Sequence, residues 1–109
     1  MLFRISTALA ASVLLFVSVE AVEAQQIRLN REGQNGVIVW ISSTHAREGN
    51  VLRSANVDVS LIIPLISCIV PPQTLAVMLS DRGYFKTIMV VDGKNKGCRG
   101  VISAGDIGK

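Results

Sequence analysis

His45 is the only histidine in the chain, and it follows two hydroxyl residues, Ser43 and Thr44. A histidine beside a hydroxyl can act as the general base that activates a nucleophile, provided that a carboxylate such as Glu48 or Asp58 orients the ring. The sequence has no Gly-x-Ser-x-Gly segment, the strained turn that exposes the nucleophile of many hydrolases. We therefore expect no catalytic residue and interpret His45 as a solvated loop histidine. A small hydrolase or lytic enzyme that uses His45 is the alternative.

Residues that bind metals or nucleotides are too few or wrongly spaced. A zinc site needs three or four converging histidine, cysteine or carboxylate ligands, and the chain has one histidine and two cysteines. The loop Asp92-Gly93-Lys94-Asn95 lacks the alternating oxygen ligands and the closing glutamate of a calcium loop. The glycines at 93, 97 and 100 join two expected strands, so no helix follows them to bind a phosphate. We expect no metal and no cofactor.

The densest basic cluster of the chain consists of Lys94, Lys96 and Arg99. These residues lie in and beside a polar loop, where they would attract an anionic group with an affinity that falls as salt rises. They are therefore the candidate binding residues. A solvated, lysine-rich turn is the competing interpretation, in which case the polar segment 43–50 becomes the next candidate for a recognition surface.

Cys68 and Cys98 are the only two cysteines. They are too far apart in sequence for a Cys-x-x-Cys redox motif. A bond between them would close a loop of about 30 residues, worth roughly 3–4 kcal/mol in the chain-entropy account of disulfide stability. Since their number is even in a chain expected to be exported, we predict an intramolecular disulfide. Free thiols and an intermolecular bond are the alternatives.

The N-terminus has the pattern of a secretory signal peptide over residues 1–24. One positive charge and the apolar residues 5–19 precede Val22 and Ala24, small residues three and one positions before the expected cut at Gln25. An uncleaved membrane anchor is the alternative, but a membrane-spanning helix needs roughly 20 apolar residues. The sequence thus predicts a periplasmic or secreted protein with no membrane span after cleavage.

The remaining residues, 25–109, suffice for a single small domain. Cleavage removes Arg4, Glu20 and Glu23, so the formal net charge of +3 becomes +4. This mild excess favours an anionic partner, although it also serves solubility. Three aromatic residues remain, at positions 40, 84 and 85. They are too few for the stacking surfaces that bind single-stranded nucleic acids, and we expect no nucleic acid partner.

Turn signals divide this domain into short elements. Strands are expected at residues 26–31, 37–42, 57–70 with a kink at Pro64, 84–91 and 98–103. The Asn-Gly pair at 35–36 predicts that the first two strands form a hairpin, and the loop at 92–97 predicts a second hairpin. Apolar residues at 75, 78 and 79, after Pro71-Pro72 and before Gly83, predict a short helix over 73–82. Residues 43–50 are expected to be a polar connection.

These patterns together predict an α+β or mainly β fold. We expect a small antiparallel sheet or partly open barrel of about five strands, with one short helix and one disulfide. By elimination of enzyme, metal and nucleotide motifs, the leading hypothesis is an exported non-enzymatic protein that binds another macromolecule, either a protein or an anionic envelope component. A structural subunit of an envelope assembly is a further alternative. The oligomeric state is not predicted.

Overall fold

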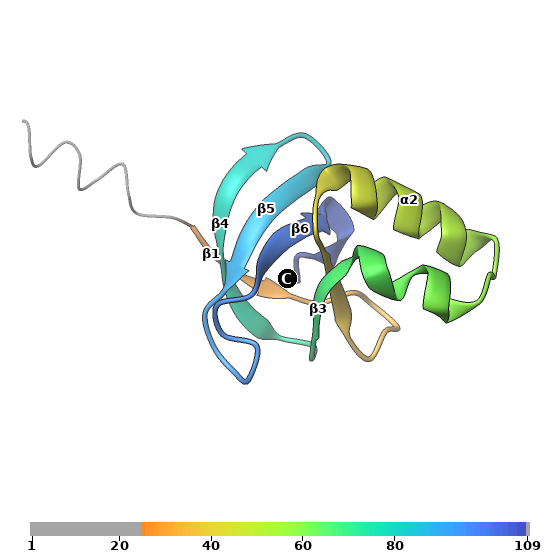
Figure 1. The fold of residues 1–109 in the computed structure, drawn as a ribbon. Helices are drawn as coiled ribbons and strands as arrows, with labels where there is room; N and C mark the ends of the chain where they lie inside the picture. The colour runs from red at the N-terminus through yellow and green to blue at the C-terminus, as the bar shows by residue number, and fades with distance from the viewer. Residues whose placement is uncertain (1–24, 109) are drawn as a thin grey trace, which may run out of the picture.

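The computed structural model describes residues 25–108, and the predicted signal peptide lies outside them (Figure 1). One twelve-residue helix and six strands make up the described part of the chain, which confirms the predicted α+β class. The elements, in chain order, are β1 (Gln26–Leu29), β2 (Val37–Trp40), α2 (Ser43–Ser54), η1 (Val59–Leu61), η2 (Ile63–Leu65), β3 (Ile66–Val70), β4 (Thr74–Arg82), β5 (Phe85–Val90), β6 (Arg99–Ser103) and η3 (Ala104–Asp106), where η is a 3-10 helix.

The strands form one open antiparallel sheet in the order β1-β4-β5-β6-β2-β3. Two consecutive pairs, β4–β5 and β5–β6, have long registers, whereas β2 meets β6 at the single pair Trp40–Val101. At this crossing a β-carbon on Gly100 would overlap the backbone of Trp40. Glycine is therefore required where the two strands cross in direct backbone contact. The edge strand β1 pairs with the C-terminal segment through a β-bridge between Leu29 and Ile107.

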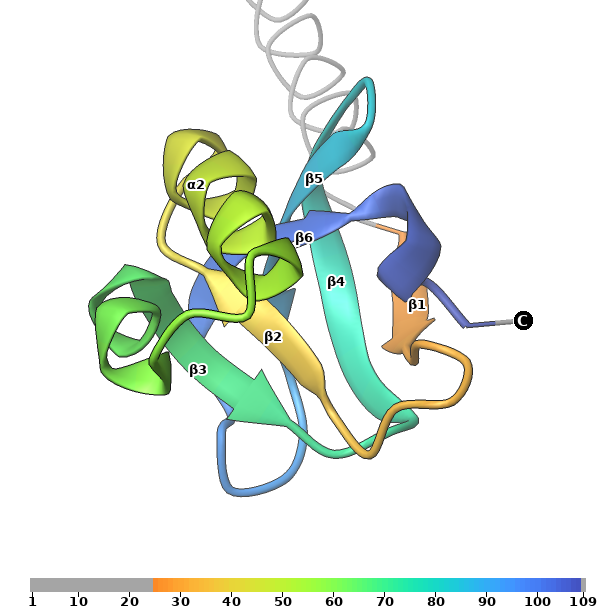
Figure 2. The same ribbon diagram turned by 90° about the vertical axis from the view of Figure 1, so that its right-hand side faces the viewer.

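The sheet has a hydrophobic cluster on each face. The inner cluster is buried between the strands and consists of Ile27, Leu29, Val37, Val39, Val70, Ala76, Ile88, Val90 and Ile102, with the two cysteines packed against it. The outer cluster consists of Trp40, Ala46, Ile62 and Val101. Figure 2 shows α2 lying along this outer face, beside β2 and the 3-10 turns that lead into β3. The helix therefore covers only part of the outer face.

The predicted helix over residues 73–82 is wrong, because this segment is the strand β4. Leu75 and Met78 suggested a helical stripe, but Ala76 is buried against the inner cluster and its neighbours on either side are less buried, as in a strand. Gly83 has a φ of 69° and follows β4 in the tight turn to β5. A positive φ suits both a helix terminus and a two-residue hairpin turn, so the glycine alone could not distinguish them.

The predicted hairpin of residues 26–31 and 37–42 is also wrong. β1 pairs with β4, and β2 pairs with β3 and β6. Gly36 does not adopt a positive φ, and the positive φ in this loop belongs to Gly33. The Asn35-Gly36 pair therefore does not form the primed turn that would have joined the two strands.

Residues 57–63 were expected to form a strand and instead form 3-10 turns. The Asp58 carboxylate accepts a hydrogen bond from the Ser60 backbone N–H at 3.0 Å, which caps η1, and Pro64 lies in the first turn of η2. Val59, Leu61 and Ile63, which would share one face of a strand, are exposed, and Ile62 is buried. Local capping thus replaces strand pairing here, because a side-chain carboxylate satisfies the backbone donor.

The polar connection expected at residues 43–50 is the first part of α2. Ser42 caps the helix by accepting a hydrogen bond from the His45 backbone N–H. The buried side of the helix is made of Ala46 and Gly49, with the half-buried Leu52 one further turn along. These residues are spaced by three but are mostly small, because the Trp40 ring fills the space beneath them. The apolar stripe was therefore too weak to predict a helix.

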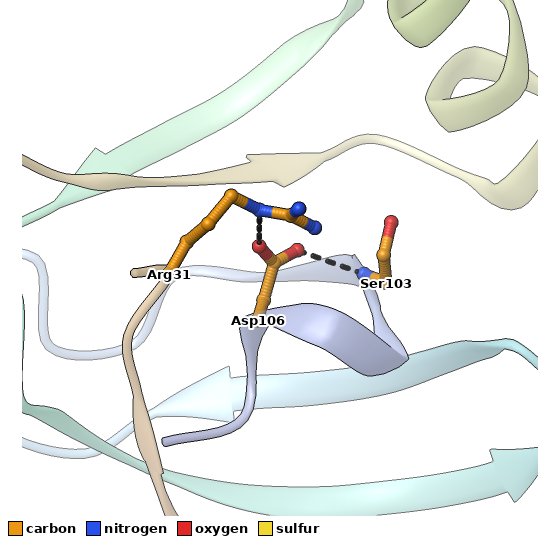
Figure 3. Close-up of polar contacts among 3 residues, drawn as sticks. All are labelled: Arg31, Ser103 and Asp106. Atoms are coloured by element: carbon orange, nitrogen blue, oxygen red, sulfur yellow. Dashed lines mark hydrogen bonds and ion pairs between the residues drawn. The ribbon is translucent and has the colours of Figure 1, made fainter. Parts of the chain in front are cut away.

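An ion pair fixes the C-terminal segment to the loop after β1 (Figure 3). Arg31 Nε donates to Asp106 Oδ1 at 2.6 Å, and Asp106 Oδ2 accepts from the Ser103 backbone N–H at 2.9 Å. Asp106 is 5% exposed. Its hydrogen bond raises the pKa of the Arg31 guanidinium. The pair ties η3 to the loop that follows β1.

Candidate functional site

A groove lies between the start of α2 and the outer face of β4, β5 and β6, and we call it the arginine groove. Its volume is about 600 Å³. It is lined by Ile41, Ser42, Ser43, Arg47, Ser80, Phe85, Thr87, Arg99, Gly100 and Val101. Two of these residues are basic and none is acidic. The lining therefore has an uncompensated positive charge beside hydroxyl and apolar groups.

The floor of the groove is a row of side chains that crosses three strands. Ser80 pairs with Thr87 across β4 and β5, and Thr87 pairs with Val101 across β5 and β6. A bulge at Leu79 interrupts the register of β4 between Met78 and Ser80. Since side chains alternate between the faces of a strand, this extra residue brings the Ser80 hydroxyl, rather than the Leu79 side chain, opposite Thr87.

Arg47 enters the groove from the second turn of α2. Its guanidinium carbon lies 5.4 Å from the centre of the Phe85 ring. A guanidinium over an aromatic face at this distance is held by a cation–π interaction. The contact restricts the long side chain before any ligand arrives and leaves the edge of its planar fork available to an anion.

Arg99 enters from the first residue of β6, and its backbone is held on both sides. The Ser67 hydroxyl donates to the Arg99 carbonyl at 2.8 Å. The preceding residue, Cys98, forms the predicted disulfide with Cys68, with a Cα–Cα distance of 6.6 Å. Alternation along β6 brings the Arg99 side chain to the same face as Val101, which is the face of the groove. The disulfide packs against the inner cluster, so it constrains the backbone just before Arg99 from the opposite face of the sheet.

The structure separates Lys94 and Lys96 from the lining of this groove. Both lysines are exposed in the loop between β5 and β6. The side chain of Asn95, which lies between them, donates to the Ile69 carbonyl at 3.1 Å and fastens the loop to β3. Of the three predicted binding residues, only Arg99 lines the groove. Its basic companion there is Arg47, which the sequence analysis did not select.

His45 is not part of the groove lining, and it contacts a different hydroxyl from those expected. Its Nδ1 is 2.6 Å from the Ser42 hydroxyl, and the same hydroxyl accepts from the His45 backbone N–H at 3.2 Å. Within residues 25–108, neither Glu48 nor Asp58 forms a hydrogen bond or ion pair with His45. Ser42 and His45 therefore form a helix cap in which the Ser42 hydroxyl contacts both the backbone N–H and the ring of His45. Neither carboxylate completes a triad with them.

The sequence does contain a pattern that indicates the helix on which Arg47 lies. Ser42 is a favourable N-cap residue, and Ala46, Gly49 and Leu52 follow at intervals of three. If residues 43–54 are read as a helix, Arg47 follows directly after the first buried position and belongs to the exposed side near the cap. That Arg47 and Arg99 line the same groove could not be predicted, because the positions of α2 and β6 relative to each other depend on tertiary contacts.

Neither a metal-binding cluster nor a membrane-spanning helix is found within residues 25–108. No three histidine, cysteine, aspartate or glutamate side chains come together there in a way that would hold a metal ion. None of the helices in this part of the chain has the length and apolar character needed to cross a membrane.

Comparison of the chain with protein-family models, with curated proteins and with solved structures gives no match.

Proposed function

We propose that this protein is an exported, non-enzymatic binding protein that recognises an acidic partner through the arginine groove. The observation that carries the proposal is the presence of two arginines in a lining without any carboxylate. Among the residues that the structure describes, neither Arg47 nor Arg99 forms an ion pair, whereas Arg31 and Lys86 do. Two free guanidinium groups at one groove favour the binding of carboxylate or similar anionic groups.

The disulfide supports both the location and the mode of binding. Such bonds persist in oxidising compartments, which fits export to the periplasm or secretion. The bond and the Ser67 hydrogen bond hold the backbone at Arg99, while Phe85 restrains Arg47. Groups that are already ordered lose less conformational entropy on binding, so affinity is gained without a larger interface.

The experiment measures retention of the purified protein on beads that carry polyglutamate, at low and high salt. Replacing Arg47 and Arg99 together by glutamine should weaken retention at low salt by about tenfold or more, because each lost charge-assisted hydrogen bond is worth roughly 1.5–3 kcal/mol. Arg53→Gln is the matched control, since Arg53 is exposed on the same helix and lies outside the groove. Equal retention of the double variant and the wild type would refute the proposal.

A small hydrolase remains the second candidate, and one observation favours it. The Ser42 hydroxyl lies 2.6 Å from His45 Nδ1 at the mouth of the groove. That distance suits proton transfer from a nucleophile to a base. A fluorophosphonate probe that labels Ser42 in the folded protein, and loses the label in His45→Ala, would support this alternative. We expect labelling no greater than that of the urea-unfolded protein.

A further inference from the structure

We infer that the occupant of the arginine groove is a peptide segment in which a carboxylate side chain stands next to an apolar one. This inference rests on the proposed function and narrows the acidic partner to a protein. It follows from the size of the groove, from the chemistry of its walls and from the small number of its cations.

The groove is larger than one anionic group requires. Its volume of about 600 Å³ falls within the range of about 300–1,000 Å³ in which drug-sized ligands bind. A lone carboxylate or phosphate would leave most of this space to water. A few residues of extended peptide would fill it and bring more than one side chain to its walls.

The walls combine charge with apolar surface. Ile41 is 50% exposed and lines the groove, together with the Phe85 ring and Val101. Contact with an apolar side chain would remove Ile41 from water, which stabilises the complex in proportion to the area covered. A sulfated polysaccharide or a nucleic acid backbone carries no such group at its anionic edge. Ile41 and Phe85 therefore favour a peptide.

Hydroxyl groups supply the remaining polar contacts. Ser43 lies at the rim, and Ser80 and Thr87 lie on the floor. A hydroxyl both donates and accepts hydrogen bonds, so it suits the carbonyl and N–H groups of a peptide as well as a carboxylate. The two arginines would bind the carboxylate, and the hydroxyls would orient the backbone beside it.

The groove has fewer cations than a nucleic acid backbone requires. Proteins that bind nucleic acid backbones neutralise several phosphates with a series of basic residues. Here two arginines line the groove, and Lys94 and Lys96 lie outside its lining. Two cations match one or two carboxylates of a folded or extended partner.

The test uses fluorescence anisotropy of the purified protein with three labelled peptides. The first alternates glutamate and leucine, the second replaces each glutamate by glutamine, and the third replaces each leucine by glycine. Dextran sulfate and phosphatidylglycerol vesicles compete as the other anionic probes. The protein variants are Arg47→Gln with Arg99→Gln, and Ile41→Ser. Their controls on α2 are Arg53→Gln and Val51→Ser, both at exposed positions outside the groove lining.

We expect the glutamate–leucine peptide to bind, with about tenfold loss for the glutamine peptide and about fivefold loss for the glycine peptide. Ile41→Ser should reduce the affinity for the first peptide and leave that for the glycine peptide unchanged, whereas Val51→Ser should alter neither. If dextran sulfate or vesicles bind through the arginines while Ile41→Ser has no effect, the peptide inference is wrong and the proposed function stands. If no anionic probe depends on Arg47 and Arg99, both are wrong.

Discussion

Gly49 lies against the indole ring of Trp40, so closely that a β-carbon on the glycine would overlap the ring. Glycine inside a helix costs about 1 kcal/mol relative to alanine. At this position the absence of a side chain allows α2 to approach β2 and to bury the largest side chain of the outer cluster. This contact sets the distance of α2 from the sheet, and with it the position of Arg47 over Phe85.

Replacing Gly49 by alanine should therefore destabilise the protein, although alanine is the better helix former. Overpacking of a dense core costs typically about 1–3 kcal/mol, which exceeds the gain in helix propensity. Urea unfolding measures the change in free energy. Glu48→Ala, at an exposed neighbouring position of the same helix, is the control and should change stability by less than about 0.5 kcal/mol. A Gly49→Ala protein more stable than the wild type would contradict the contact.

Removing the Cys68–Cys98 bond should have a larger effect. The two residues are 30 positions apart, and the double replacement by alanine should lower the free energy of unfolding by roughly 3–4 kcal/mol, since the unfolded chain regains the entropy of the open loop. Mass spectrometry of the protein purified from its native compartment without reductant should find it lighter than the reduced form by the mass of two hydrogen atoms. Two free thiols in that sample would show that the bond does not form.

The pair Arg31–Asp106 gives a third prediction. Asp106→Ala should cost about 1.5–3 kcal/mol, the usual range for hydrogen bonds to a charged group, because it removes the bonds to Arg31 and to the Ser103 N–H. Glu32→Ala, at the exposed next position, is the control. Denaturant titrations of both variants measure these losses. If Asp106→Ala unfolds at the same denaturant concentration as Glu32→Ala, the pair contributes nothing.

The pH dependence of this loss follows from the raised pKa of Arg31, whose main cause is the hydrogen bond to Asp106. A group with a raised pKa in the folded state contributes stability below its unfolded pKa and loses it only as pH rises through the folded value. Both values lie far above neutrality for an arginine. The stability difference between wild type and Asp106→Ala should therefore be constant between about pH 7 and pH 9. A difference that shrinks over this range would point to another titrating group.

The hairpin of β5 and β6 was predictable from the sequence, whereas β4, which also pairs with the strand that follows it, was not. The hairpin has β-branched strands and a glycine-rich loop. Cys98 lies at its base, and Cys68 lies on β3, which β2 separates from β6 in the sheet order. Local pattern and local pairing agree there, so the sequence alone predicts the two strands and the turn. The disulfide was predicted on a different ground, the even number of cysteines in a chain expected to be exported.

Elements whose secondary structure depends on tertiary contacts were not predictable. The segment 73–82 has apolar residues at spacings that suit either a helix or a strand. It forms a strand because it pairs with β1 and β5. α2 has few large apolar residues, because Trp40 from β2 supplies the bulk of that contact. Arg47 was missed with the helix, whereas Arg99 was found from its charge alone. The groove requires both elements, so its existence follows from the tertiary structure.

The last prediction uses binding kinetics to distinguish the role of the two lysines from that of the two arginines. Lys94 and Lys96 are exposed and lie outside the groove lining, so they act on an acidic partner mainly at long range, over a Debye length of about 10 Å at 0.1 M salt. Charges of this kind change the association rate, whereas charges in direct contact change the dissociation rate. Replacing both lysines by glutamate should slow association of the glutamate–leucine peptide at low salt by about threefold and have little effect at high salt. Arg99→Gln should speed dissociation at both salt concentrations.

Stopped-flow anisotropy measures both rates, and circular dichroism checks that each variant is folded. Equal association rates for the wild type and the lysine variant at low salt would mean that the loop is only a solvated turn, and recognition would then be assigned to the arginine groove alone.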